Sequence, residues 1–281
     1  MGTALQTLIE ATAWEMEKPK AYGPFHLTFM LVGFAVCILL AWWLRHLGEK
    51  GNRRLLIGMG AFLILTEVYK QLFYYFHIGG GSYQWWIFPF QLCSTPLYVL
   101  PFLSFLPDCR IRDFAAAYTM TVGLIGGIAV YLTPKTVFGT RLFFNIHTMI
   151  HHGLQIVSGV YTAIYYRHRI NRRFYFDGIC VFAILFVIAN LLNTVGYDLL
   201  VASGLMSEGA DFNMFYISPR AEQTVPVLSD LLKSFPPIVY IIGYFVFLSL
   251  GALIIMCFTR FVCVISEKQR EKRNGERIEE V

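Results

Sequence analysis

The chain has 281 residues, of which 56% are hydrophobic, 16% aromatic and only 15% charged. Soluble domains carry roughly 25% charged residues, so this composition argues against a soluble protein and is typical of one that crosses a membrane several times. The net charge of +5 does not indicate a nucleic-acid partner. Basic residues between apolar runs orient a membrane protein and contact anionic lipid instead.

Seven apolar runs organise most of the chain, and each is close to the ~20 residues that a helix needs to span a ~30 Å hydrocarbon core. They cover residues 25–44, 55–77, 87–106, 114–132, 143–165, 175–200 and 235–261. None alternates with the period of a barrel strand, and backbone polar groups at this depth need internal partners. We therefore expect an all-α polytopic membrane protein whose residues 25–261 form a seven-transmembrane-helix bundle.

The connections between the runs orient the expected bundle. Sixteen of the 23 Lys and Arg residues lie after the first, third and fifth runs and from residue 260 onwards, whereas six lie on the other side. By the positive-inside tendency, the N-terminal segment 1–24 is outside and the charged tail 262–281 is cytoplasmic. Segment 1–24 lacks the basic start and apolar core of a cleavable signal. The external loop 201–234 is the longest connection, and loops of this length are often functional.

Polar side chains interrupt the apolar runs at matching depths. In chain order they are Glu67, Lys70, Gln71, Gln91, Cys93, Ser94, Thr95, Asn145, His147, His151, His152, Gln155, Asn190 and Asn193. Lys70, Cys93 and His147 each lie about six or seven residues from the outer end of a run, a depth of about 9 Å. Asn193 lies at the same depth. Because ionisable side chains inside a membrane tend to mark pathways or active sites, we predict one shared site in the outer third of the bundle.

Cys93 is the candidate nucleophile of this layer. A buried thiol is inert unless a histidine or a positive charge stabilises its thiolate. His147 or His151 would supply the first and Lys70 the second. Glu67 and Lys70 share a helix face and can neutralise each other, so the alternative for this pair is a buried ion pair that only fixes helix packing.

Helical geometry limits which histidines can act together. At ~100° per residue, His147 and His151 lie about 40° apart, whereas His152 points about 100° away from His151. At most two of the three are therefore expected to face one centre, and His152 is expected to be a packing residue. Pro89 is expected in the first turn of the third helix, and Pro96 is expected to kink that helix just after the cysteine.

Three motifs together resemble a known family. They are FQLCSTP at 90–96, HTMIHHG at 147–153, and FNMFYISP followed by FPPIVYI before the last run. In order and placement they resemble the YwaF-like integral membrane family, bacterial relatives of transmembrane protein 164, over about residues 22–261. The chain departs from that pattern at Ser94, where relatives often carry an acidic residue, and in the order of the residues after Asn213.

The resemblance implies a phospholipid acyltransferase of the bacterial cytoplasmic membrane. Such an enzyme moves a fatty acyl chain between a phospholipid and a lysophospholipid through a thioester on its active-site cysteine, with a histidine required. Cys93 matches that cysteine, and His147 or His151 matches the histidine. We expect no cofactor and no metal. The substrate-binding residues are expected to be Lys70, Glu67, Gln91, Ser94, Asn193 and Asn213, with Lys70 on a phosphate and Gln91, Ser94 or Asn193 donating to the oxyanion.

Two other functions are compatible with the same residues. His147 and His151 have an i, i+4 spacing used by zinc enzymes, and Glu67 would serve as a further ligand or base in a metal-dependent lipid hydrolase. The sequence has no extended metal motif such as HExxH. The polar layer also suits the cavity of a non-enzymatic receptor or transporter, although neither a DRY-like end to the third run nor an NPxxY motif in the seventh is present.

Overall fold

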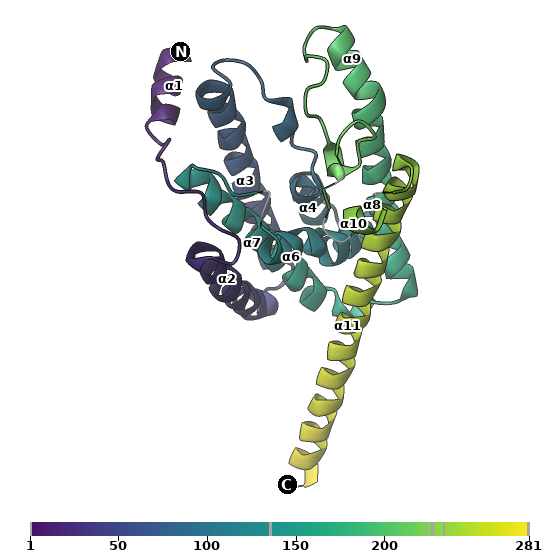
Figure 1. Ribbon diagram of the computed structural model, residues 1–281. Helices are drawn as coiled ribbons and strands as arrows, with labels where there is room; N and C mark the ends of the chain where they lie inside the picture. Colours follow the sequence, from purple (N-terminus) through teal and green to yellow (C-terminus); the bar gives the residue numbers. More distant parts are fainter. Residues whose placement is uncertain (1, 135–136, 223, 226–227, 233, 280–281) are drawn as a thin grey trace.

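A computed structural model describes residues 2–134, 137–222, 224–225, 228–232 and 234–279, and these residues form helices and loops without a strand (Figure 1). The helices are α1 (Gly2–Glu10), α2 (Pro24–Trp43), α3 (Glu49–Phe73), α4 (Pro96–Phe105), α5 (Arg110–Tyr118), α6 (Leu124–Leu132), α7 (Leu142–Tyr165), α8 (Arg172–Leu191), α9 (Tyr197–Ala202), α10 (Leu228–Leu232) and α11 (Pro237–Glu279). Single π-helical turns extend α3, join α5 to α6 and join α8 to α9.

Five helical stretches of the described chain are long and apolar enough to cross a membrane. They are Pro24–His46, Glu49–Ile78, Arg110–Leu132, Arg172–Ala202 and Pro237–Ser266. These stretches coincide with the first, second, fourth, sixth and seventh apolar runs. The fifth run forms α7, a continuous helix whose polar side chains keep it outside this set. The protein is thus a multi-pass membrane protein.

The third run does not form the continuous, kinked helix that its sequence predicts. Residues Leu92–Ser94 form a 3₁₀ turn, and α4 begins only at Pro96. Proline lacks an N–H group and has a fixed φ, so it fits the first position of a helix better than its interior. The expectation that Pro89 occupies the first helical turn is therefore wrong, because Pro96 takes that place. As a result, Cys93 lies in irregular backbone just before α4.

Stretch Arg110–Leu132, which contains α5 and α6, forms the centre of the bundle. Of its most apolar window 72% is buried, against 11% for Pro24–His46 at the periphery. α5 packs against α8, and α3 packs against α4. Both α6 and α2 pack against α7. Gly127 lets α6 approach α7 closely, because a Cβ there would lie 2.7 Å from the carbonyl oxygen of His152. This contact places the histidine-rich part of α7 against the centre of the bundle.

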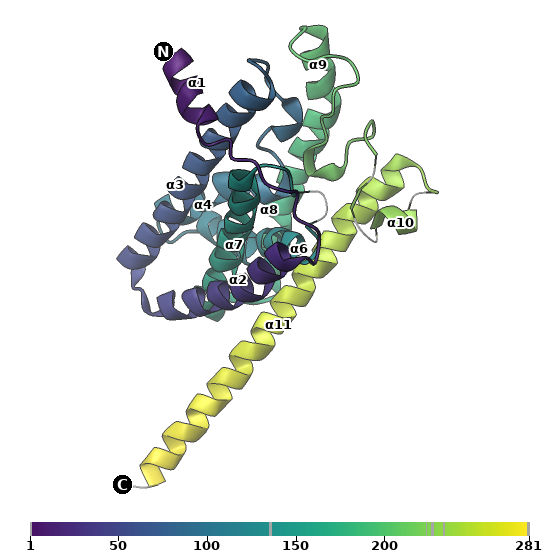
Figure 2. The same ribbon diagram turned by 60° about the vertical axis from the view of Figure 1, so that its left-hand side comes forward.

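The outer surface of the bundle carries large apolar side chains. On α2, α8 and α11 the exposed ones include Leu31, Val32, Leu39, Ile184, Val187, Leu191, Ile238, Ile242 and Leu250. Such a surface suits contact with lipid rather than with water. α11 runs along the bundle and extends beyond it toward the C-terminus, whereas α1 and α9 lie at the opposite end (Figures 1 and 2).

Candidate active site

A pocket of about 950 Å³ opens at the end of the bundle that carries α1 and α9. Its walls come from the end of α3, the irregular segment before α4, the first half of α7 and the loop that follows α9. The polar lining includes Lys70, Gln91, Cys93, Ser94, Arg141, His147, Thr148, His151, His152, Asp211, Asn213, Tyr216, Ser218, Arg220 and Glu222. Of the four residues expected in one layer, Lys70, Cys93 and His147 line this pocket.

His151 contacts the segment that carries Cys93. Its Nε2 lies 2.9 Å from the carbonyl oxygen of Cys93. A carbonyl oxygen only accepts hydrogen bonds, so Nε2 carries the ring proton and Nδ1 of the neutral imidazole is free to accept one. Nδ1 is buried and has no hydrogen-bond partner in the described part of the protein. An oriented base is thus present against the backbone of the half-buried Cys93.

The other two histidines of α7 line the same pocket. The ring centroids of His147 and His151 are 5.5 Å apart, and those of His151 and His152 are 5.4 Å apart. All three therefore line one pocket, because it is wide enough to reach a broad arc of α7. His152 donates from Nδ1 to the carbonyl oxygen of Thr148 at 2.6 Å. Of the three, His151 is the one that contacts the Cys93 backbone.

Lys70 lines the pocket and forms an ion pair with the carboxylate of Glu67. Its Nζ lies 2.8 Å from Oε2 of Glu67, while the other oxygen of Glu67 accepts a hydrogen bond from Gln71 Nε2 at 2.6 Å. Gln71 also donates to the carbonyl oxygen of Ile87 at 2.9 Å. Among the described residues, Lys70 belongs to the pocket lining and Glu67 does not. Glu67 therefore orients Lys70 and connects α3 to the segment that leads to Cys93.

Two side-chain amides hold the loop after α9 in place. Gln91 donates to the carbonyl oxygen of Asn213 at 2.9 Å and accepts from the N–H of Phe215 at 3.0 Å. Asn193, which is fully buried, donates to the carbonyl oxygen of Met214 at 2.9 Å and accepts from its N–H at 2.7 Å. We expected both amides to serve the substrate, but the structure places them on the loop backbone.

The loop needs this support because its backbone is strained. Phe215 and Tyr216 have φ values of 58° and 59°, a left-handed conformation that is costly for residues other than glycine. Asn213 adds a further bond by accepting from the N–H of Ser218 at 2.9 Å. Because Gln91 lies two residues before Cys93, the same hydrogen bonds fix the loop and the thiol-bearing turn relative to each other.

Two arginines that line the pocket were not among the residues predicted for the site from the sequence. Arg220 donates from Nη1 to the carbonyl oxygen of Asn193 at 2.9 Å, and from Nη2 to both carboxylate oxygens of Asp198 at 2.9 and 3.1 Å. Arg141 pairs with Glu15 at 2.7 Å, where the N-terminal segment lies beside the start of α7. Both lie outside the apolar runs, so a search restricted to membrane depth passes over them. With Lys70 they supply three cations to one pocket.

The described residues do not gather a metal-binding set. No three His, Cys, Asp or Glu side chains in this part of the chain are grouped to hold an ion. The i, i+4 pair of His147 and His151 lies in the pocket, but both carboxylate oxygens of Glu67 are already engaged by Lys70 and Gln71. These residues therefore do not fit the site that a metal-dependent hydrolase would need.

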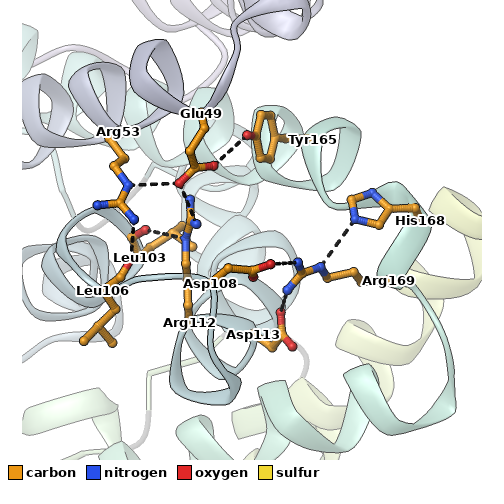
Figure 3. Close-up of polar contacts among 10 residues, drawn as sticks. All are labelled: Glu49, Arg53, Leu103, Leu106, Asp108, Arg112, Asp113, Tyr165, His168 and Arg169. Carbon is orange, nitrogen blue, oxygen red and sulfur yellow. Dashed lines mark hydrogen bonds and ion pairs between the residues drawn. The ribbon is translucent and has the colours of Figure 1, made fainter.

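A second polar cluster lies at the other end of α3 and α7 (Figure 3). Glu49 accepts hydrogen bonds at Oε1 from Arg53 Nε (2.9 Å) and from Arg112 Nη1 (2.7 Å), and at Oε2 from the Tyr165 hydroxyl (3.0 Å). We call these four residues the Glu49 cluster. They join α3, α5 and α7 at the end remote from the pocket.

Beside it, Arg169 bridges two carboxylates. It donates to Asp108 at 2.6 Å and to Asp113 at 2.5 Å (Figure 3). The Arg169 guanidinium holds the pKa of Asp108 below its usual range, because its hydrogen bonds favour the ionised carboxylate. This bridge connects the turn after α7 to the turn between α4 and α5 and to the first turn of α5.

Comparison with known proteins adds one finding. The sequence model of the TMEM164 family matches residues 21–270, a range that contains every helix lining the pocket. No curated protein matches the chain, and no solved structure does.

Proposed function

The chain belongs to the TMEM164 family, and from this membership and the pocket we propose that it is a membrane-embedded acyltransferase. It moves a fatty acyl chain from a phospholipid to a lysophospholipid through a thioester on Cys93. The observation that carries this proposal is the contact of His151 with the Cys93 carbonyl group, which leaves His151 Nδ1 free inside the pocket. A cysteine nucleophile requires a base in its pocket that can accept the thiol proton, and this free nitrogen is a candidate for it.

The proposed topology has seven crossings, with the N-terminus outside and the C-terminal tail cytoplasmic. In addition to the five apolar stretches, α7 crosses as a 24-residue helix, about 36 Å long at ~1.5 Å per residue. The seventh crossing consists of α4 and the irregular segment directly before it. Its irregular backbone fits membrane depth because it lines the pocket rather than facing lipid. In this orientation the pocket lies in the outer leaflet of the membrane, which we take to be a bacterial cytoplasmic membrane.

In the first half of the reaction, His151 Nδ1 accepts the thiol proton and the Cys93 thiolate attacks an ester carbonyl carbon of the donor phospholipid. The tetrahedral oxyanion collapses, the ester C–O bond breaks, and the departing lysophospholipid oxygen takes the proton from His151. Ser94 lines the pocket next to Cys93 in the chain, and we assign to its hydroxyl group the role of donor to the oxyanion. An acyl thioester on Cys93 remains.

In the second half, the hydroxyl group of an acceptor lysophospholipid loses its proton to His151 and attacks the thioester. The C–S bond breaks, and the thiolate takes the proton back, so that the cycle consumes and releases no net proton. Lys70 holds a phosphate group of the lipid in place, with Glu67 setting its position. Catalysis then needs no cofactor.

The test is acyl transfer by the purified protein in nanodiscs. A phospholipid with an isotope-labelled acyl chain and an unlabelled lysophospholipid are supplied, and the labelled product is measured by lipid mass spectrometry. We expect Cys93→Ser to lower transfer on the order of 10³-fold or more. Cys180→Ser, which changes an exposed thiol on α8, is the matched control and retains transfer. Full transfer by Cys93→Ser would contradict the proposal.

A further inference from the structure

Buried polar side chains continue from the pocket along α7 toward the Glu49 cluster. Below His151 come Gln155, Tyr161 and Thr162 on α7 and Tyr166 directly after its end, and each is at most 2% exposed. At ~100° per residue, His151, Gln155 and Thr162 fall within about 40° of one another. The polar stripe of α7 therefore does not stop at the pocket but runs down the interior of the bundle.

These side chains have polar atoms without protein partners. Both amide atoms of Gln155 and the hydroxyl groups of Tyr161, Thr162 and Tyr166 are buried, and none of them has a hydrogen-bond partner within the part of the chain that the structure describes. Burying such a group unpaired costs about 1–3 kcal/mol, and buried polar groups are ordinarily bonded to protein or water. Four such residues, three on α7 and one directly after it, indicate that water reaches them.

The stripe meets two further groups of this kind at the Glu49 cluster. Asn52 on α3 is fully buried, and neither of its amide atoms has a hydrogen-bond partner among the described residues. Nη2 of Arg112 on α5 is also buried and has no partner among them. The guanidinium of Arg112 lies 5.7 Å from the centre of the Tyr166 ring. Glu49 itself has a side chain that is 49% exposed, so the stripe ends at solvent.

The spacing suits water-mediated contacts. From His151 to Tyr166 the chain rises about 22 Å, in steps of about 6 Å to Gln155, about 10 Å to Thr162 and about 6 Å to Tyr166. These steps are too long for direct hydrogen bonds, but one water can bridge each short step and a chain of two or three waters the long one. Hydroxyl and amide groups both donate and accept, so every position of the stripe can pass a hydrogen-bonded chain onward.

We propose that this stripe, from His151 through Gln155 and Thr162 to Tyr166 and Glu49, is a hydrated path that carries protons between the pocket and the opposite face of the bundle. At the pocket end His151 Nδ1 takes up or releases the proton, facing His147, His152, Lys70 and Glu67. At the other end the charged groups that face the path are Glu49, Arg53 and Arg112. The inference rests on the seven-crossing topology proposed above and not on thioester chemistry.

Gln155 is the residue at which the path can be tested most specifically. A Cβ added at Gly126 on α6 would lie 3.4 Å from Gln155 Nε2, an ordinary van der Waals distance. Gly126→Ala therefore places a methyl group against the amide without a clash, and Gln155→Leu removes both polar atoms at similar size. The matched controls are Gly58→Ala, whose Cβ meets nothing within 4 Å, and Asn190→Leu, which removes a helix amide that bonds to Phe186.

The experiment measures proton flux in liposomes that contain the purified protein and an interior pH dye, driven by a potassium gradient with valinomycin. We expect the wild type and both controls to acidify the interior faster than protein-free liposomes. Gln155→Leu and Gly126→Ala should lower the protein-dependent rate about tenfold. A wild-type rate equal to that of empty liposomes would overturn the proposal, as would equal slowing in the control variants or no slowing in Gln155→Leu.

Acyl transfer measured on the same samples separates the two proposals. Because the transfer cycle has no net proton change, Gln155→Leu should transfer acyl chains at the wild-type rate while losing flux. Flux without transfer in the wild type would refute the enzymatic proposal alone, and transfer without flux would refute the path alone.

Discussion

The two polar ends of the bundle use their charges differently. In the Glu49 cluster, both carboxylate oxygens of Glu49 are engaged, by two guanidinium groups and a tyrosine hydroxyl. In the pocket, His151 has one ring nitrogen anchored on the Cys93 carbonyl group and the other without a partner among the described residues. One end holds a carboxylate whose acceptors are occupied, and the other holds a base whose acceptor is open.

This difference separates stabilisation from chemistry. A carboxylate surrounded by donors connects the helices that supply those donors. A histidine held by one nitrogen keeps its orientation while the second nitrogen can accept a proton. We therefore expect substitutions in the pocket to change acyl transfer more than stability, and substitutions in the Glu49 cluster to do the reverse.

The largest expected effect comes from the open nitrogen. His151→Gln removes the base beside Cys93 and should lower acyl transfer on the order of 10²–10⁴-fold. His147→Gln, which changes a histidine that does not contact the Cys93 backbone, should lower transfer at most about tenfold. A larger loss of transfer in His147→Gln than in His151→Gln would show that His147 is the base. It would contradict the role given to the open nitrogen of His151.

Removal of Glu49 should act on the fold instead. Glu49→Ala leaves Arg112, which is 2% exposed, without its carboxylate, so we expect the free energy of unfolding to fall by about 2–3 kcal/mol. Thermal unfolding in detergent measures the change. Glu17→Ala, at an exposed acidic residue, is the control and should be neutral. Loss of acyl transfer in protein that is still folded would show that the two ends are not separate.

Asn193→Leu tests whether the loop after α9 is a positioning element. The substitution removes the two hydrogen bonds to the Met214 backbone and leaves the positive φ of Phe215 and Tyr216 without that support. We expect transfer to fall about tenfold through misplacement of the pocket wall, together with faster proteolysis within the loop. Asn190→Leu is the matched control. An unchanged cleavage rate would mean that the amide of Gln91 holds the loop alone.

The smallest effect is expected at Arg169. The pKa of Asp108 is lower in the folded protein because of this arginine, so the ionised form stabilises the fold above the unfolded pKa of ~3.9. That contribution is lost as pH falls through the folded value. Arg169→Gln should cost at most about 1 kcal/mol at pH 7, because the pair is exposed, and should flatten the pH dependence of stability below about pH 4.

Arg167→Gln is the control for this change, since Arg167 donates only to the carbonyl oxygen of Ile164 among its described contacts. Equal effects of the two substitutions on acid stability would exclude a specific role for the Asp108 pair.

Depth along the helices was readable from the sequence. Apolar runs and alternating direction place Lys70, Cys93 and His147 at one level, and the structure brings these residues to one pocket. A membrane imposes the same thickness on every spanning segment, so depths counted along different runs can be compared. The apolar runs also located the five apolar stretches of the structure, since their boundaries follow length and hydrophobicity alone.

Irregular backbone was not readable in the same way. The turn at Leu92–Ser94 depends on Pro96 starting a helix rather than bending one, and both outcomes suit the same residues. The strained conformation of Phe215 and Tyr216 carries no glycine signal. It is stabilised by amides distant in the chain, so the positioning tasks of Gln91 and Asn193 appear only when the loop is seen in place.

The most direct test of the acyltransferase account is the intact mass of the purified protein after incubation with a phospholipid of defined acyl chain. The account predicts an added mass of one acyl group that maps to Cys93 and is removed by hydroxylamine, as a thioester is. Turnover of lipid without any adduct at Cys93, under conditions that preserve thioesters, would contradict it.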